Sequence, residues 1–470
     1  MTNGSCRHHT APRLLLVYPA TQKLGWVRRF QLPSLSLTQV AAATPPEWEV
    51  VLADELHDQV PFDGDFDAIG ITVMTHQATR AYQIADRFRK KGVPVILGGI
   101  HPTVLPEEGL EHADAVVIGE AEPVWAHVLN DLRKGQLAPL YQAPIPADDL
   151  LTVPWSRRDI LAGRPYLTTQ TVQASRGCPY DCPFCTVTPY FGRSFRYRDP
   201  GDVLAELRTF DRKLTVFLDD NILGDPARAK PILEGMAGLG LRWGGQANLR
   251  FAEDPELVRL VARSGCIGIF VGIESVTGSH ANHPKTGSGS SPVDLVKRVR
   301  DAGIVLEASL IFGFDDHDES IFETTGRFLE ECAPSLPTFH ILTPYPGTAL
   351  FRQFQQEGRL LHTDWSRYDH AQVVFRPKQM TPERLYRGWV EARKEAYRWP
   401  AILRRVRQNP AGRFTTLWYN ILRKGPNDRL DPATAVFSEE SAGHLPRTGD
   451  RATADPVGDT TPALPQADRT

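Results

Sequence analysis

The chain has 470 residues, enough for about three domains at the common size of roughly 150 residues each. Lys and Arg total 53 against 56 Asp and Glu, and this net charge of −3 excludes nucleic-acid binding through a basic overall charge. No apolar run reaches the roughly 18 residues of a membrane-spanning helix, and the first residues lack a secretory signal pattern. We therefore expect a cytoplasmic protein.

Residues 13–135 alternate short apolar runs with helical patterns. The runs typical of buried strands are 14–18, 50–53, 68–73, 94–99 and 115–119. The clearest helical pattern spans 78–92, where apolar residues recur at helical spacing. Strands that alternate with helices predict an α/β fold with a parallel, doubly wound (Rossmann-like) sheet, in which ligands bind beyond the carboxyl ends of the strands.

A Pro-rich stretch at 136–165 is predicted to be a linker without regular structure, and a second alternating region follows at 166–365. Its candidate strands are 169–175, 214–220, 242–247, 267–274, 305–313 and 338–344. Six strand–helix units are too few for a closed eight-stranded barrel. They predict a partial (β/α)6 barrel of the TIM type, with its site at the carboxyl ends of the strands.

Residues 366–436 are predicted to form a helical C-terminal extension, with a helix start at Thr381 followed by Pro382. From Thr381 to Lys424 there are eleven Lys and Arg against three Glu. This basic region is interpreted either as a solvated helical cap over the barrel or as a surface for anionic lipid head groups or an acidic partner. The ends of the chain, 1–12 and 437–470, are predicted to be disordered.

Three of the six cysteines, Cys178, Cys182 and Cys185, stand in a C-x3-C-x2-C pattern right after a candidate strand. Thiolates are suitable ligands for iron–sulfur clusters or zinc. Three of them can hold three irons of a 4Fe-4S cluster and leave the fourth iron open to another ligand. Structural zinc would need a fourth protein ligand, for which no local candidate exists. A disulfide would leave one thiol over and does not suit the cytoplasm.

The remaining cysteines carry no comparable pattern. Cys266 and Cys332 lie among apolar residues and are predicted to be small core side chains, whereas Cys6 falls in the predicted disordered start.

With Phe184 just before its third cysteine, the motif resembles that of the radical S-adenosylmethionine enzymes. The resemblance implies that S-adenosylmethionine binds the open iron through its amino and carboxylate groups. One electron from the cluster then cleaves the sulfonium, which gives methionine and a 5′-deoxyadenosyl radical. It also implies a low-potential electron donor of the flavodoxin or ferredoxin type.

The resemblance assigns five positions to S-adenosylmethionine: Phe184, Asp219, Glu274, Ile311 and Gly313. Glu274 would contact the ribose hydroxyls, and the stretch from Ile311 to Gly313 would contact the adenine. The superfamily's usual Gly-Gly-Glu signature after the second strand is replaced by Leu-Asp-Asp-Asn at 218–221. The alternative is that these carboxylates only cap loops and helices.

A doubly wound domain that precedes the radical domain resembles the cobalamin-binding radical S-adenosylmethionine enzymes, over about 13–400 of the chain. The strand-end residues that the resemblance assigns to cobalamin are Thr72, Thr75, Gly98, Gly99, Gly119 and Glu120. Glycines there allow the backbone to approach a flat macrocycle closely. The alternative is a domain that binds nothing and only docks on the barrel.

Many cobalamin proteins carry an Asp-x-His-x-x-Gly motif whose His binds cobalt. Here Asp54 and His57 have the wrong spacing, so we expect cobalamin without a lower His ligand. His76 and His101 lie near strand ends and are interpreted as loop residues rather than cobalt ligands.

The resemblance implies a methyltransferase with three cofactors: a 4Fe-4S cluster, S-adenosylmethionine and cobalamin. One S-adenosylmethionine would methylate cobalt(I), and a second would supply the radical that takes hydrogen from an unactivated carbon, which then collects the methyl group. The alternatives are oxidative cyclisation or rearrangement with the same cofactors, or a non-catalytic sensor. The basic C-terminal helices resemble the extension of radical enzymes that methylate hopanoid lipids. A small-molecule substrate is expected, but no pattern separates a lipid from a pyrrole, a sugar or a peptide.

Overall fold

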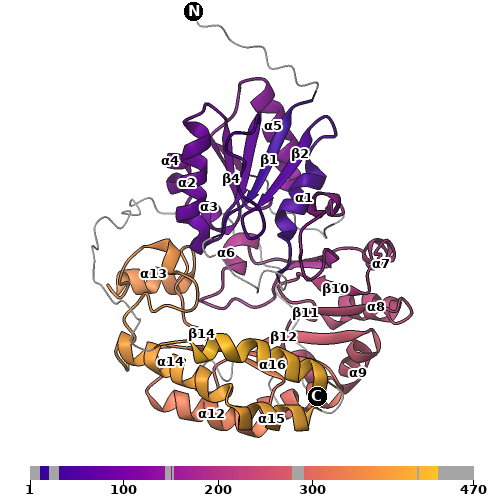
Figure 1. Ribbon diagram of the computed structural model, residues 1–470, viewed down its shortest axis with the longest axis vertical. Coiled ribbons are helices and arrows are strands. Elements are labelled where there is room, and N and C mark those ends of the chain that lie inside the picture. The colour runs from indigo at the N-terminus through magenta and orange to yellow at the C-terminus, as the bar shows by residue number, and fades with distance from the viewer. Residues whose placement is uncertain are drawn as a thin grey trace, which may run out of the picture.

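The computed structural model describes residues 11–20, 31–142, 150, 153–277, 291–409 and 412–431. The predicted disordered start and tail, and Cys6 with them, lie outside these ranges except for residues 11 and 12. Two sheet-containing units are stacked along the long axis of the molecule, and helices of the C-terminal region cover the lower one (Figure 1).

The N-terminal unit is a parallel sheet of six strands in the order β2-β1-β3-β4-β5-β6. Its strands are β1 (Arg13–Tyr18), β2 (Glu49–Asp54), β3 (Ala68–Thr72), β4 (Val95–Gly98), β5 (Ala115–Ile118) and β6 (Leu140–Gln142). Helices α1 (Leu35–Ala43) and α5 (Glu122–Arg133) cover one face of the sheet, while α2 (Ala78–Arg89) and α4 (Pro106–His112) cover the other (Figure 1). The predicted doubly wound fold is confirmed. The direction in which successive strands are added to the sheet reverses between β1 and β3, and doubly wound sheets bind ligands at such a point.

One strand of this sheet lies in the predicted linker. β6 pairs with β5 and buries Tyr141, and a short 3-10 helix follows at Asp159–Leu161. The prediction that 136–165 has no regular element is therefore wrong at these residues. A strand of three residues, of which only the middle one is buried, is too short for its alternation of apolar and polar residues to be recognised in the sequence.

The second unit is a parallel sheet in the order β14-β13-β12-β11-β10-β7, which confirms the predicted partial barrel. Its strands are β7 (Thr171–Val172), β10 (Leu214–Phe217), β11 (Arg242–Asn248), β12 (Cys266–Glu274), β13 (Val305–Phe312) and β14 (Leu336–Ile341). The helices between them are α7 (Pro200–Arg208), α8 (Pro226–Met236), α9 (Pro255–Arg263), α11 (Pro292–Asp301) and α12 (Ser320–Cys332), and α13 (Ala349–Gln356) follows β14. Cys266 and Cys332 are buried in its core, as predicted.

The first predicted barrel strand, 169–175, is split in two. Only β7 remains in the barrel sheet, and the chain then forms β8 (Ser175–Gly177), which pairs antiparallel with β9 (Phe195–Tyr197). This separate two-stranded ribbon carries the cysteine loop between its strands.

The C-terminal region forms α14 (Pro382–Ala396), α15 (Trp399–Gln408) and α16 (Arg413–Asp428). Thr381 caps α14 by accepting a hydrogen bond from the backbone N–H of Arg384, which confirms the predicted helix start. α14 lies along β14, the last strand of the barrel sheet: Trp389 Nε1 donates to the carbonyl of Phe339 (3.0 Å). Further along that strand, the Tyr397 hydroxyl donates to the carbonyl of Pro337 (2.8 Å). None of the described helices is long and apolar enough to cross a bilayer.

Candidate cofactor site between the two sheets

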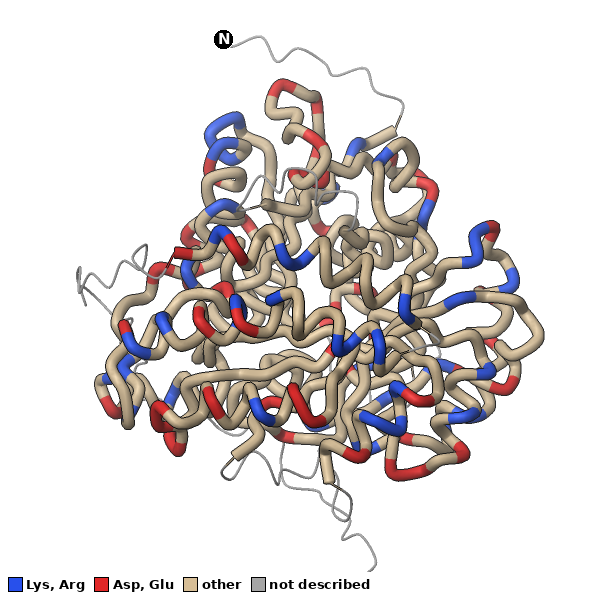
Figure 2. Tube along the Cα trace, turned by 60° about the horizontal axis from the view of Figure 1, so that its bottom comes forward, with Lys and Arg blue, Asp and Glu red and all other residues tan. Residues whose placement is uncertain are grey.

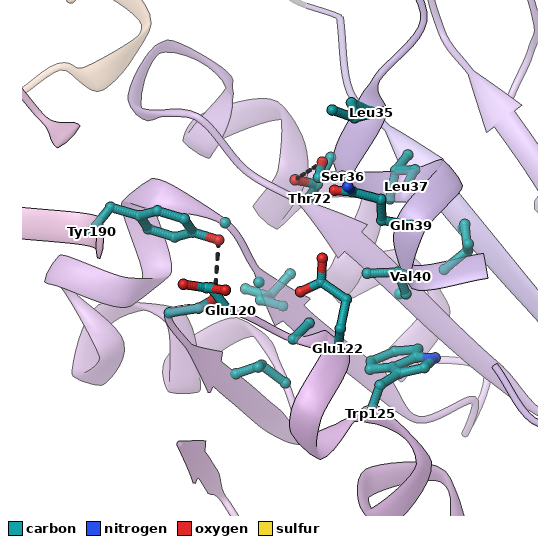
Figure 3. A pocket seen from close by; sticks show the side chains of 18 of the residues that line it. Leu35, Ser36, Leu37, Gln39, Val40, Thr72, Glu120, Glu122, Trp125 and Tyr190 are labelled. Carbon is teal, nitrogen blue, oxygen red and sulfur yellow. Dashed lines mark hydrogen bonds between the residues drawn. The ribbon is translucent and has the colours of Figure 1, made fainter. Parts of the chain in front are cut away.

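A cavity that is partly open to solvent lies where the carboxyl ends of the two sheets face each other. The N-terminal unit contributes α1, the ends of β3, β4 and β5, and the first turn of α5, and Figure 3 shows side chains from these elements around the space. The barrel unit contributes Gln173, Arg176, Tyr190, Phe191, Leu218 and Asp220. Both units therefore share one site, as a ligand bound between them would require.

Glycines form part of the cavity wall on the side of the N-terminal sheet. Gly99 has φ of +99°, and a Cβ atom there would lie 2.9 Å from the backbone N and O of Val73. Gly119 has φ of +74°. Only glycine adopts such a backbone readily, so these positions keep the wall flat and free of side chains.

The structure places five of the six positions predicted for cobalamin in this wall: Thr72, Gly98, Gly99, Gly119 and Glu120. Thr75 does not line the cavity. It is buried, and its hydroxyl lies 3.4 Å from Nδ1 of His101. The other ring nitrogen of His101, Nε2, lies 3.2 Å from the carboxylate of Glu108. His101 is therefore a buried hydrogen-bonding residue, as interpreted from the sequence.

Glu120 and its neighbour Glu122 form ion pairs across the boundary between the units. Arg176 of β8 pairs with Glu120 (2.5 Å) and with Glu122 (2.5 Å), and Arg196 of β9 also pairs with Glu120. Burial acts to raise the pKa of Glu120, but hydrogen bonds and charges from Arg196 and Arg176 outweigh it and hold the pKa below its usual range. The carboxylate of Glu120 is therefore ionised and already engaged by protein cations.

The cysteine loop is fixed at its root by the stretch that follows β10. Asp219 accepts hydrogen bonds from the backbone N–H groups of Ala174 (3.1 Å) and Ser175 (2.5 Å) and from the Ser175 hydroxyl (2.6 Å). Asp220 accepts from the N–H of Gly177 (3.1 Å). Burial raises the pKa of Asp219 to about 7 and that of Asp220 to about 6. Asp219, which the sequence assigned to S-adenosylmethionine, lies here as a support of the loop.

The three cysteines follow β8 directly, and none of them forms a disulfide. Cys182 is buried and Cys178 and Cys185 are half-buried, with the N–H of Cys185 bonded to the carbonyl of Cys182 (3.0 Å). The amide of Asn221 lies 3.8 Å from the Cys178 sulfur. Within the described ranges, no three His, Cys, Asp or Glu side chains converge on a position for a single metal ion. Three thiols in one loop suit an iron–sulfur cluster, whose irons can each take one thiolate.

The other positions assigned to S-adenosylmethionine lie at the carboxyl edge of the barrel sheet. Glu274 is the last residue of β12 and has φ of +65°, a strained value for a side chain other than glycine. Ile311 is in β13, and Gly313 follows that strand with φ of +107°. The ring of Phe184 lies 5.6 Å from that of Phe314. The structure thus brings the cysteine loop against the end of β13.

Sequence reasoning missed a histidine cluster at the end of β14. The rings of His340 and His370 lie 5.5 Å apart, and Nε2 of His370 lies 2.9 Å from the Tyr345 hydroxyl. Among the described residues, buried Nε2 of His340 has no hydrogen-bond partner. His370 has φ of +64°, so its backbone is strained as well. The only sequence signal was a polar residue inside the apolar run 338–344.

Burial of His340 predicts loss of stability in mild acid. Burial, with smaller contributions from His370, Arg393 and Arg423, lowers the pKa of His340 to about 3. The unfolded chain binds this proton near pH 6.5, so the free energy of unfolding falls as pH drops below that value. For His340 the loss is about 2 kcal/mol at pH 5.

We therefore expect His340→Asn to lose less thermal stability than the natural protein between pH 8 and pH 5, as measured by calorimetry. His127→Asn is the matched control, because its side chain is 66% exposed. Parallel pH profiles of the natural protein and His340→Asn would contradict the prediction.

Comparisons with known proteins agree with this arrangement. Residues 27–129 match the B12 binding domain family, 172–329 the Radical SAM superfamily, and 348–412 a domain of unknown function, DUF4070. The chain is 33% identical over 441 residues to bacteriochlorophyllide d C-12(1)-methyltransferase of Chlorobaculum tepidum, covering 89% of this chain and 94% of that one. It is 27% identical to hopanoid C-2 methylase of Rhodopseudomonas palustris, covering 87% and 81%.

Solved structures show the same fold. The cobalamin-dependent S-adenosylmethionine radical enzyme OxsB with aqua-cobalamin bound gives a TM-score of 0.62 at 15% identity, covering 89% of this chain and 72% of that one. The radical S-adenosylmethionine methyltransferase TsrM from Kitasatospora setae gives 0.60 at 17%, covering 74% and 76%. The resemblance found in the sequence is thus confirmed. The chain belongs to the cobalamin-dependent radical S-adenosylmethionine methyltransferase family, whose cofactors are a 4Fe-4S cluster, S-adenosylmethionine and cobalamin.

Proposed function

We propose that this enzyme transfers a methyl group to an unactivated carbon of a small molecule, a natural-product or lipid intermediate. When bound, cobalamin supplies the methyl group, and the cluster with S-adenosylmethionine supplies the 5′-deoxyadenosyl radical. The observation that carries the proposal is the shared cavity, because residues of the cobalamin unit and of the ribbon that bears the cysteines line the same space. An electron donor of the flavodoxin or ferredoxin type would complete the system.

In this proposal the chain's own residues hold and separate the reactants. Cys178, Cys182 and Cys185 would bind the cluster, and the carboxyl edge of β12 and β13, with Glu274, would hold S-adenosylmethionine. The glycine wall would receive the corrin ring, while Tyr190, whose hydroxyl donates to the carbonyl of Gly119 (3.0 Å), ties the cysteine loop to that wall (Figure 3). Apolar side chains line much of the cavity, and with the cofactors in place they would limit the access of water to reactive species.

The relatives support an apolar, polycyclic substrate. Two relatives are named as methyltransferases of bacteriochlorophyllide d, and another is named a hopanoid C-2 methylase. The alternative is oxidative cyclisation or rearrangement with the same cofactors. It is supported by 24% identity over 362 residues to the anaerobic magnesium-protoporphyrin IX monomethyl ester cyclase of Cereibacter sphaeroides.

Methyl-labelled S-adenosylmethionine separates these readings. The protein would be reconstituted anaerobically with iron, sulfide and cobalamin, reduced, and incubated with bacteriochlorophyllide d or a hopanoid hydrocarbon as probes. We expect 5′-deoxyadenosine together with label in the probe, detected by mass spectrometry. A probe that changes mass without label would favour cyclisation or rearrangement. A reduced protein that forms no 5′-deoxyadenosine would overturn the radical assignment.

A further inference from the structure

Exposed apolar side chains are concentrated on the last two helices of the described chain. Eight large apolar side chains are exposed among the described residues, and five of them belong to α15 and α16. These five, here called the C-terminal apolar patch, are Trp399 (50% exposed), Leu403 (51%), Phe414 (83%), Trp418 (56%) and Ile421 (42%). Such a concentration at the surface is typical of an interaction site rather than of scattered exposure.

Helical spacing puts the patch on one side of the helix pair. Trp399 and Leu403 are four residues apart, and Phe414 and Trp418 repeat the same interval on α16. The two helices pack against each other, and Nζ of Lys424 on α16 lies 6.0 Å from the centre of the Trp399 ring on α15. The exposed apolar side chains of the patch therefore lie on two neighbouring helices.

The opposite side of the helix pair is held by buried polar groups. The guanidinium of Arg405 donates to the side-chain oxygen of Asn420 (2.6 Å) and to the carbonyl of Ala396 (2.7 Å). Asn420 and Asn409 bond to Ser335 at the start of the turn into β14. Packing of α15 and α16 on the barrel therefore does not depend on the patch side chains, which contribute little to the fold.

The surroundings of the patch are basic. Residues 398–431 contain eight Lys and Arg against two Asp, in a chain whose net charge is −3. Four of these cations, Arg398, Arg404, Arg423 and Lys424, are paired with carboxylates, and Arg405 is buried. Arg407 and Arg429 form no ion pair with any described residue and are left to contact a ligand. Figure 2 turns this end of the molecule forward and shows Lys and Arg spaced among uncharged residues.

We propose that the C-terminal apolar patch binds the surface of an anionic lipid bilayer. Two tryptophans and a phenylalanine among arginines are the combination that inserts at the boundary of head groups and acyl chains, with the cations contacting lipid phosphates and carboxylates. α15 and α16 lie at the far end of the molecule from the N-terminal sheet (Figure 1), so a bound membrane leaves the cofactor cavity uncovered. The proposal is independent of the methyl-transfer reaction.

Flotation of the full-length protein with lipid vesicles tests the proposal. We expect binding to phosphatidylcholine vesicles that contain about a third phosphatidylserine, and at least tenfold weaker binding to phosphatidylcholine alone or in high salt. Phe414→Glu with Trp418→Glu should lower binding at least about tenfold. Leu140→Glu is the control, because that side chain is exposed on a distant edge strand and its change should leave binding intact.

The same experiments distinguish a lipid bilayer from other partners that could cover the patch. Equal binding to neutral and anionic vesicles, or unchanged binding of the double variant, would overturn the proposal. A dimer that the double variant dissociates, without vesicle binding, would assign the patch to a second copy. Vesicle binding that appears only after removal of 432–470 would assign it to the chain's own tail. Radical formation by the double variant should be unchanged, so a negative flotation result leaves the proposed reaction untouched.

Discussion

Replacing Cys185 by alanine is expected to abolish 5′-deoxyadenosine and methylated product while cobalamin binding persists. The loop would keep two thiols, too few to hold a cluster with a single open iron, so turnover should fall at least about a thousandfold, as when one member of a catalytic unit is lost. The cobalamin unit has its own sheet, and Cys185 belongs to neither of the cores that pack on it. Iron content, the visible spectrum of bound cobalamin and product analysis measure the three effects.

Cys332→Ala provides the matched control. Cys332 is a fully buried core cysteine at the end of α12, so its loss should cost some stability but neither iron nor turnover per folded molecule. Equal product formation by Cys185→Ala and the natural protein would refute the assignment of the cluster to this loop.

The second large effect is expected for Arg176→Met. This change removes the cation that Glu120 and Glu122 share, in a place where both carboxylates are about nine-tenths buried. Glu120 keeps its ion pair with Arg196, whereas Glu122 loses the cation that it contacts. Removing one partner of a buried ion pair costs about 3–5 kcal/mol, because the remaining charge stays desolvated. Since Arg176 is two residues from Cys178, we also expect weaker iron binding. Chemical denaturation and iron titration measure the two effects.

Arg133→Met is the control for the loss of an arginine. Arg133 forms an ion pair with Glu47 in which both side chains are at least half exposed, so its replacement should change stability by less than about 1 kcal/mol. Adding Glu122→Gln to Arg176→Met should restore part of the stability, because Glu120 keeps its ion pair with Arg196. If this double variant is as unstable as Arg176→Met, the ion pairs are not the cause.

The sequence was most informative where one physical signal dominated. Continuous apolar runs such as 115–119 belong to strands buried on both faces, and nearly all of them became strands of the two sheets. Three thiols in eight residues have few uses, so the cysteine loop could be located without a structure. The glycines at strand ends come together in one cavity wall, since parallel strands present their carboxyl ends at one edge.

What the sequence could not provide were the contacts between segments far apart in the chain. The pairing of Arg176 with Glu120 joins residues separated by 56 positions, and no local pattern predicts it. The hydrogen bond from the Ser175 N–H to the carboxylate of Asp219, which the resemblance assigned to S-adenosylmethionine, joins residues separated by 44 positions and is equally hidden from local patterns. The three-residue β6 and the break between β7 and β8 are set by sheet pairing rather than by local propensity.

The hydrogen bonds from Trp389 and Tyr397 to the outer carbonyls of β14 have a consequence for the growth of the barrel sheet. An exposed strand edge recruits further strands, whether from the same chain or from another copy, and can seed aggregation. Side chains of α14 occupy the acceptors that such a strand would need. The curved sheet is thereby terminated at six strands on this side, and neither closure into a complete ring nor addition of a foreign β-segment can proceed from it.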